Sequence, residues 1–253
     1  TGEAAGDFHI SIEGIVGSTF NDYLVGGVAN NILQGFSGDD ILEGHGGADL
    51  LDGGDGADQM NGGAGADVFD GAAGFDTARY DGATAGVIAF LTDAWANTSE
   101  AAGDAYLSVE ALYGSNFNDT LGGSAVANEL QGFAGTDFIY GYAGNDFIGG
   151  GNGGDFLEGG AGTDQLQGGA GNDQFIFRAG ESNGDAVLDF AGNGAAAGDN
   201  LLFIGYGTAG QGATFTQLNA TQWQITSADG LITDIITLTN GASVDASDYG
   251  WGS

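Results

Sequence analysis

The sequence lacks cysteine and proline altogether, and its 253 residues include only two basic side chains, Arg79 and Arg178. The absence of cysteine excludes a disulfide framework and a zinc–thiolate site. Thirty-five acidic residues give a formal net charge of −33. Because phosphate binding needs a basic surface, we expect no nucleic-acid partner. A bound cation would offset the self-repulsion of this charge.

Long apolar runs are also missing, so we expect no membrane span. No basic-then-apolar signal peptide follows Thr1, and export would therefore need another route. Glycine accounts for 53 residues, which by itself suggests disorder, but 42% of the residues are hydrophobic and 11% are aromatic. This combination predicts a chain whose folding depends on a condition being met.

A nine-residue phrase, Gly-Gly-x-Gly-x-Asp-x-apolar-x, is repeated along the chain and is clearest in GGDGADQMNGGAGADVFDG from Gly53 to Gly71. Position one of the phrase is always glycine, from Gly17 to Gly71 and from Gly114 to Gly168. Position six falls every nine residues, at Asp22, Asn31, Asp40, Asp49, Asp58, Asp67 and Asp76, then at Asp119, Asn128, Asp137, Asp146, Asp155, Asp164 and Asp173. Position eight is apolar throughout, from Leu24 to Ala78 and from Leu121 to Phe175.

A larger duplication contains these two runs. GDFHISIEGIVGSTFNDYL from Gly6 returns as GDAYLSVEALYGSNFNDTL from Gly103, 97 residues later. Residues 1–16 therefore resemble the tail of a preceding unit, and we expect further copies upstream.

One phrase is too short to bury its apolar side chain alone, but stacked coils can bury it against equivalent residues of their neighbours. Two phrases make one coil, so we expect turns 18 residues apart to stack. Strand alternation then turns positions seven and nine outward. The stacking would place Asp40 beside Asp58 on one edge and Asp49 beside Asp67 on the other.

Stacked carboxylates repel or take up protons unless a cation lies between them. Oxygen ligands without nitrogen or sulfur select calcium or magnesium, and a flexible cage of carboxylates and carbonyls favours calcium. Glycine allows the tight turn and a close approach of the carbonyls. The candidate calcium ligands and turn residues are Asp22, Gly35, Gly38, Asp40, Gly44, Asp49, Gly53, Asp58, Gly62, Asp67 and Asp76, then Asp119, Gly132, Asp137, Gly141, Asp146, Gly150, Asp155, Gly159, Asp164, Gly168 and Asp173.

The phrases GGDGADQMN, GGAGADVFD, GGAGTDQLQ and GGAGNDQFI resemble the signature GGxGxDxUx of the RTX (repeats-in-toxin, haemolysin-type) calcium-binding repeats. The resemblance implies an all-β fold of two right-handed parallel β-rolls, with several Ca²⁺ ions in the turns. It also implies secretion from a Gram-negative bacterium by the type I machinery. The first two phrases of each run lack glycine at position four, and Asn31 and Asn128 replace aspartate. We therefore expect the first coil of each roll to be a poor calcium site or an apolar adaptor.

The resulting domain plan is a tail at 1–16, a first roll at 17–79, a β connector at 80–113, a second roll at 114–177 and a strand-rich cap with a type I secretion signal at 178–253. We expect the first roll to loosen at Ala78, the connector to keep stacking, and Trp95 to be a core or loop anchor. Glu13 and Glu110 occupy matching positions and either close an end calcium site or are plain solvated strand residues, the second being favoured. Asp185, Asp189 and Asp199 are either further calcium ligands or solvated loop residues, and again the second is favoured.

Candidates for catalysis are few. His9 and His45 are the only histidines, His45 is expected to face solvent, and no HExxH or GxxxxGK motif occurs. The repeat period explains the paired carboxylates as ion ligands, so we expect no enzyme active site. The favoured function is a calcium-binding module that folds after type I secretion and aids export of a larger extracellular protein. The alternative is an adhesin or polysaccharide-binding accessory module. An ice-binding face is disfavoured because position five is irregular.

Overall fold

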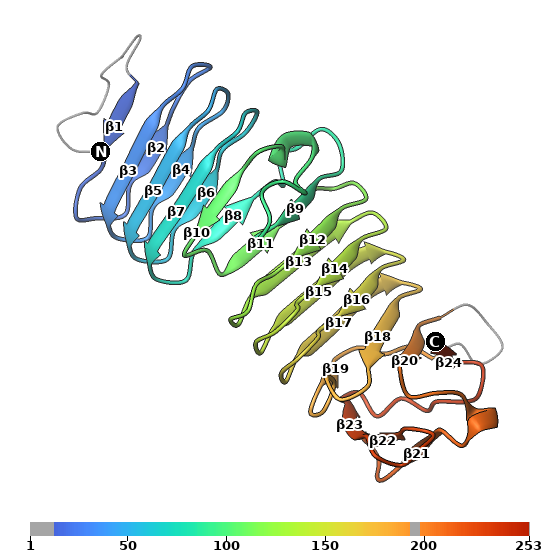
Figure 1. Ribbon diagram of the computed structural model, residues 1–253. Helices are drawn as coiled ribbons and strands as arrows, with labels where there is room; N and C mark the ends of the chain where they lie inside the picture. Colours follow the sequence, from blue (N-terminus) through green and yellow to red (C-terminus); the bar gives the residue numbers. More distant parts are fainter. Residues whose placement is uncertain (1–12, 193–197, 253) are drawn as a thin grey trace.

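The structure is a computed structural model that describes residues 13–192 and 198–252. Its strands stack into a long parallel β-roll, with β1 at one end and the C-terminal strands at the other (Figure 1). The expected all-β fold is confirmed, since the only helices among the described residues are two short 3₁₀ turns, η1 (Ser99–Ala101) and η2 (Ala209–Gln211). The tail at 1–16 lies mostly outside the described residues, as do His9 and residues 193–197.

The first sheet covers one side of the N-terminal roll. It contains, in order, β1 (Gly14–Val16), β3 (Ile32–Ser37), β5 (Leu50–Asp55), β7 (Val68–Ala73) and β10 (Ala105–Leu107).

A second sheet of twelve strands runs through both rolls and is called here the continuous sheet. It contains, in order, β2 (Tyr23–Val25), β4 (Ile41–Glu43), β6 (Gln59–Asn61), β8 (Thr77–Arg79), β11 (Ala111–Tyr113), β13 (Glu129–Ala134), β15 (Phe147–Gly153), β17 (Gln165–Gly171), β19 (Ala186–Val187), β23 (Thr233–Leu238), β22 (Gln222–Thr226) and β21 (Thr214–Gln217).

The third sheet covers the second roll. It contains, in order, β9 (Ile88–Phe90), β12 (Thr120–Gly122), β14 (Phe138–Tyr140), β16 (Phe156–Glu158), β18 (Gln174–Arg178), β20 (Asn200–Ile204) and β24 (Tyr249–Gly252).

The register between neighbouring strands is 18 residues within each roll, as the two-phrase coil requires. Leu33 pairs with Leu51, and Leu51 pairs with Phe69. These position-eight side chains are fully buried. At position seven of other phrases, Gln59 and Gln165 are exposed. The apolar column between the sheets is therefore the core, and strand alternation sends positions seven and nine outward.

The connector stacks without a break. Strand β8 pairs with β6 on one side and with β11 on the other, and Ala78 is fully buried. The prediction that the roll loosens at Ala78 is wrong, because the connector contributes buried Tyr80 and Val87 to the same core cluster. Trp95 is not an anchor either, since 98% of its surface is exposed.

The connector also shifts the coil by one strand. The duplication makes β11 the equivalent of β1, yet β1 lies in the first sheet and β11 lies in the continuous sheet. The first sheet ends at β10, and the third sheet begins at β9. One sheet therefore continues through the junction, while its partner is exchanged.

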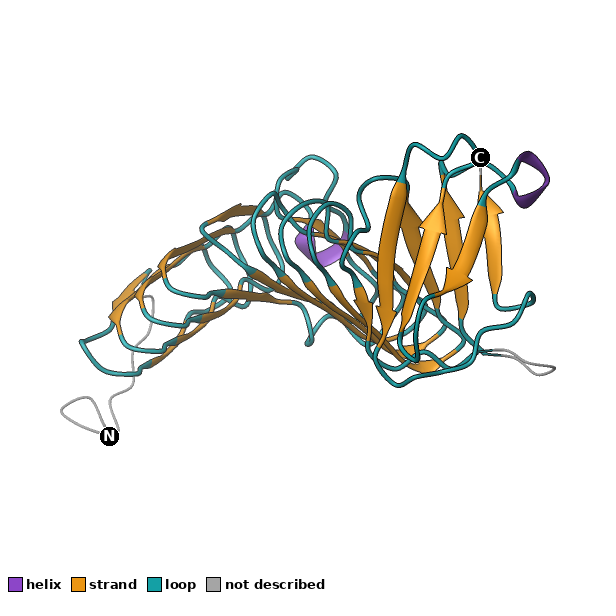
Figure 2. Cartoon of the chain, turned by 90° about the horizontal axis from the view of Figure 1, so that it is seen from below, coloured by secondary structure: helices purple, strands orange, loops and turns teal. Residues whose placement is uncertain are grey.

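The C-terminal segment covers the end of the second roll, with its longer strands standing at that end of the molecule (Figure 2). Strand β19 pairs with β17 on one side and, also in parallel, with β23 on the other. Strands β22 and β21 then follow β23 in the continuous sheet with antiparallel pairing. Residues 227–230 form the turn between β22 and β23.

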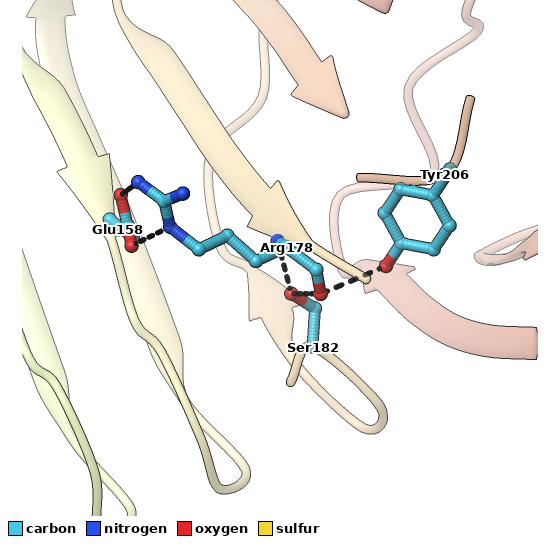
Figure 3. A network of polar contacts seen from close by, with 4 residues as sticks. All are labelled: Glu158, Arg178, Ser182 and Tyr206. Carbon is cyan, nitrogen blue, oxygen red and sulfur yellow. Dashed lines mark hydrogen bonds and ion pairs between the residues drawn. The ribbon is translucent and has the colours of Figure 1, made fainter. Parts of the chain in front are cut away.

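A polar network joins this cap to the last coil (Figure 3). The Arg178 guanidinium pairs with Glu158 on β16, and the Arg178 backbone N–H donates to Ser182 Oγ at 3.0 Å. The Tyr206 hydroxyl donates to the Arg178 carbonyl oxygen at 3.2 Å. The arginine thus links a roll strand and the cap through side chain and backbone together.

Candidate metal centre

The position-six aspartates form rows along both edges of each roll. In each row, an aspartate Oδ1 accepts a hydrogen bond from the backbone N–H of the position-six residue 18 residues earlier. The distance is 2.8 Å from Asp40 N to Asp58 Oδ1 and 2.8 Å from Asp49 N to Asp67 Oδ1. The predicted placement of Asp40 beside Asp58 and of Asp49 beside Asp67 is confirmed.

The other carboxylate oxygen, Oδ2, is buried, and among the described residues it has no hydrogen-bond partner in ten of these aspartates. They are Asp40, Asp49, Asp58, Asp67, Asp76, Asp137, Asp146, Asp155, Asp164 and Asp173. Each of these residues is at most 2% exposed. A buried acceptor without a donor costs free energy, and a buried charge without a partner costs more. Ten such atoms in register need a common partner.

The position-one glycine of the same phrase borders each of these oxygens. A carbonyl oxygen of the next coil borders the same space at Gly35, Gly44, Gly71, Gly132, Gly141 and Gly150. A methyl group added at Gly44 would overlap Asp49 Oδ2 and lie 2.8 Å from the Gly62 carbonyl oxygen. Gly132 and Gly150 show the same arrangement, with the next coil's carbonyl oxygen 2.7 Å from the added methyl group in each case. Glycine is therefore required at position one because the space next to it belongs to two oxygens.

These donors fit a hard divalent cation. They are carboxylate and carbonyl oxygens only, and such a set suits calcium better than zinc or copper. No group of three or more His, Cys, Asp or Glu that could hold a metal is found in residues 13–192 and 198–252. Any cation in these turns must therefore take much of its coordination from backbone carbonyls, which is consistent with the glycine-rich turns.

Burial is the main cause of a raised pKa in these aspartates. It raises the pKa of Asp67, Asp137 and Asp146 to about 7, although the hydrogen bond that each accepts from a backbone N–H opposes the shift. The charges of neighbouring carboxylates, such as Asp104 beside Asp67, raise the pKa further. Without a cation, the fold therefore favours protonated carboxyl groups.

The first coil of each roll differs from the rest. Asp22 Oδ2 accepts hydrogen bonds from the Ser18 backbone N–H and hydroxyl, and Asp119 Oδ2 accepts one from the Ser115 N–H. These carboxylates are already satisfied, which fits the expectation that the first coils are poor calcium sites. Gly38, at position four, lies against the backbone of Phe20 rather than beside an unpartnered carboxylate.

Three aspartates outside the repeats extend the rows. Asp104, Asp185 and Asp199 accept hydrogen bonds from the N–H groups of Asp67, Asp164 and Asp173 at 2.8, 3.0 and 3.0 Å. The interpretation of Asp185 and Asp199 as solvated loop residues is wrong, because the chain keeps stacking after the last phrase and buries both of them. Asp104 was not among the sequence candidates, although Gly103-Asp104 precedes a strand as Gly-x-Asp does in the repeats.

Two more acidic residues differ from the favoured interpretation. Asp189 is half-buried and accepts the N–H groups of Gly168 and Gly169 at 2.9 and 2.8 Å. Glu110 is half-buried, precedes β11, and accepts the Asp76 N–H at 3.1 Å. Neither is a plain solvated residue, because the carboxylate of each accepts backbone N–H groups of the last repeat phrase of its roll, which no further repeat follows to pair with. His45 is exposed, as expected.

A family model described as the RTX calcium-binding nonapeptide repeat matches four times, at residues 16–51, 43–78, 113–148 and 149–181. Together these matches cover just over half of the chain. The chain belongs to the RTX family. RTX repeats are structural modules that bind calcium, and proteins with RTX repeats are typically secreted. Among the described residues of this RTX chain, no helix is long and apolar enough to cross a bilayer.

Solved structures with similarity to this RTX chain include the solution structure of the AlgE6R3 subunit from the Azotobacter vinelandii mannuronan C5-epimerase. It is 28% identical, with 53% of this chain and 78% of that chain covered, at a TM-score of 0.24. The extracellular lipase LipA from Serratia marcescens is 19% identical, with 96% of this chain and 40% of that chain covered, also at a TM-score of 0.24. No curated protein sequence matches this chain.

Replacing Gly44 by Ala is predicted to raise the calcium midpoint of folding, because the new methyl group would overlap Asp49 Oδ2. Gly46→Ala in the same turn is the matched control, since a methyl group there has no atom nearer than 3.8 Å. The midpoint would be measured by far-ultraviolet circular dichroism across a calcium titration. Equal midpoints for the two variants would contradict a cation site beside Gly44 and Asp49 Oδ2.

Acidification is predicted to promote folding in the absence of metal. The folded pKa values near 7 lie above the ordinary value of 3.8, so between them the folded chain binds more protons than the unfolded chain. Stability of the metal-free chain should thus rise as the pH falls from about 8 to about 5. Circular dichroism in chelator measures this, and Asp67→Asn should weaken the dependence. A metal-free chain that is no more folded at the lower pH would contradict the raised pKa values of these buried aspartates.

Proposed function

We propose that this RTX chain is a calcium-triggered folding module of a larger extracellular protein. The observation that carries the proposal is the set of ten buried aspartate oxygens without a hydrogen-bond partner among the described residues. Their proposed partners are Ca²⁺ ions, held by the Oδ2 atoms and by carbonyl oxygens of the position-one glycines. The number of ions bound is left to measurement.

Two contributions that disfavour folding make the fold dependent on the ion. The chain carries a net charge of −33, and folding orders its glycine-rich turns, each ordered residue at a backbone entropy cost on the order of 1–2 kcal/mol. Calcium reduces the repulsion between stacked carboxylates, and because the site does not exist in the unfolded chain, the free energy of binding becomes free energy of folding.

This dependence suits export. In a cytosol poor in free calcium the chain would stay unfolded, and outside the cell millimolar calcium would fold it. We propose that residues 178–253 combine the cap with a signal read by the type I secretion machinery. The cap closes the end of the stack, which repeat folds need for solubility.

Replacing Asp58 and Asp155 together by Asn tests the proposal. Asparagine keeps an oxygen to accept the backbone N–H of the preceding coil but removes the charge. The calcium midpoint is predicted to rise by on the order of tenfold, equivalent to about 1.4 kcal/mol. The control is Asp55→Asn with Asp93→Asn, which removes the same charge at exposed positions. Equal midpoints in the two double variants would count against the proposal.

A second candidate function, adhesion or polysaccharide binding, draws on aromatic side chains on the outer face of the third sheet. The Phe138 and Phe156 rings stack with centroids 4.5 Å apart, and the Tyr140 and Tyr142 rings lie 6.3 Å apart. Phe138 and Tyr142 are 39% and 48% exposed. Exposed rings can stack on sugars as well as on protein partners.

A glycan array probed with the calcium-loaded chain tests this second candidate. Binding that is lost in Phe138→Ser with Tyr142→Ser, at unchanged circular dichroism, is the result expected for a sugar-binding face. An array without signal would leave the module with its folding role alone.

A further inference from the structure

The row that ends at Asp76 finishes differently from a repeat. Asp76 is fully buried, and its Oδ2 has no hydrogen-bond partner among the described residues. In the repeats, the next coil would supply a position-one glycine and another aspartate. Here the next coil is the connector segment Ser108–Glu110, which lies outside the residues matched by the RTX repeat model.

A backbone carbonyl of this segment replaces the glycine carbonyl. A methyl group added at Gly71 would overlap the Ser108 carbonyl oxygen and lie 2.5 Å from Asp76 Oδ2. At Gly35, within the repeats, the corresponding atoms are Asp40 Oδ2 and the Gly53 carbonyl oxygen. The same two kinds of oxygen thus border the space at the end of the roll.

Two further features of the segment support the match. Ser108 has a φ of +48°, a left-handed conformation that costs free energy in serine and must be held by its surroundings. Glu110 Oε2 accepts the Asp76 N–H at 3.1 Å, just as Asp76 Oδ1 accepts the Asp58 N–H at 2.9 Å. Glu110 therefore supplies the carboxylate of the next position in the row.

We propose that Asp76, the Ser108 carbonyl and Glu110 hold a divalent cation of the calcium type beside Gly71, so that connector residues outside the nonapeptide repeats complete the last cation site of this row. The proposal rests on the proposed calcium-dependent function. The donors are again oxygen only, and the unpartnered Asp76 Oδ2 is the atom that requires the ion.

The second row of the same roll ends at Asp104, the residue that follows Asp67 in that row. Asp67 Oδ2 is also without a hydrogen-bond partner among the described residues. Asp104 Oδ1 accepts the Asp67 N–H, and Asp104 Oδ2 accepts the Tyr80 hydroxyl at 2.5 Å. The Tyr80 hydroxyl also lies 2.5 Å from that of Tyr106, and Asp104 is fully buried. Hydrogen bonds from tyrosine satisfy this terminal carboxylate. The two ends therefore differ in the carboxylate that follows the last repeat aspartate, because Asp104 accepts a tyrosine hydroxyl in addition to a backbone N–H, whereas Glu110 is half-buried and accepts the Asp76 N–H.

The test is the number of calcium ions bound per chain, measured by equilibrium dialysis and atomic emission at the concentration that saturates the unaltered protein. Glu110→Gln keeps an acceptor for the Asp76 N–H but removes the charge, and it is expected to bind one ion fewer. The matched control is Glu13→Gln, the equivalent residue 97 positions earlier, which is exposed and should leave the number unchanged.

A backbone variant tests the carbonyl independently. Ser108→Val puts a β-branched residue at a positive φ and should lose the same ion, whereas Ser108→Gly should retain it. Circular dichroism in calcium checks that each variant is folded. If the unaltered chain binds calcium and both Glu110→Gln and Ser108→Val bind as many ions as it does, the cation site formed by Asp76, the Ser108 carbonyl and Glu110 is refuted. If the unaltered chain binds none, the proposed function itself fails.

Discussion

The structure depends on one electrostatic constraint, the stacking of buried carboxylates 18 residues apart along the edges of each roll. A hydrogen bond from the neighbouring coil satisfies one oxygen of each group, and the other oxygen borders a space that only glycine leaves open. Each coil therefore adds apolar burial in the middle and unbalanced charge at the edges. In the proposed function, an ion that binds at the edges would couple these two terms, so that folding would follow binding.

The ends of the rows show how the chain manages this constraint without a repeat. Asp104 is satisfied by a tyrosine hydroxyl, and Asp22 and Asp119 are satisfied by serine. At the end of the second roll, Asp185 and Asp199 extend both rows into the cap. Hydrogen-bond donors satisfy the carboxylates at these positions, and the remaining positions, whose Oδ2 atoms have no donor among the described residues, are the ones that we propose for cations.

Most of the roll could be predicted from the sequence because its period is strict. The period places Leu33 on Leu51 and Asp49 beside Asp67, and both pairs lie as expected. The connector and the start of the cap have no period, so the burial of Asp104, Asp185 and Asp199 depends on where the chain resumes pairing. Trp95, expected to be an anchor, lies in the loop between β9 and β10 and is exposed. The shift that places β11 in a different sheet from its equivalent β1 likewise follows from pairing across the connector.

The most direct test of the account is far-ultraviolet circular dichroism of the purified chain in chelator and then across a calcium titration, with magnesium as the control. The account predicts a disordered spectrum in chelator at neutral pH and a cooperative transition to β structure with calcium but not with magnesium. A β spectrum that persists in chelator would mean that packing alone stabilises the roll. Calcium would then not control folding, and the central claim would be wrong.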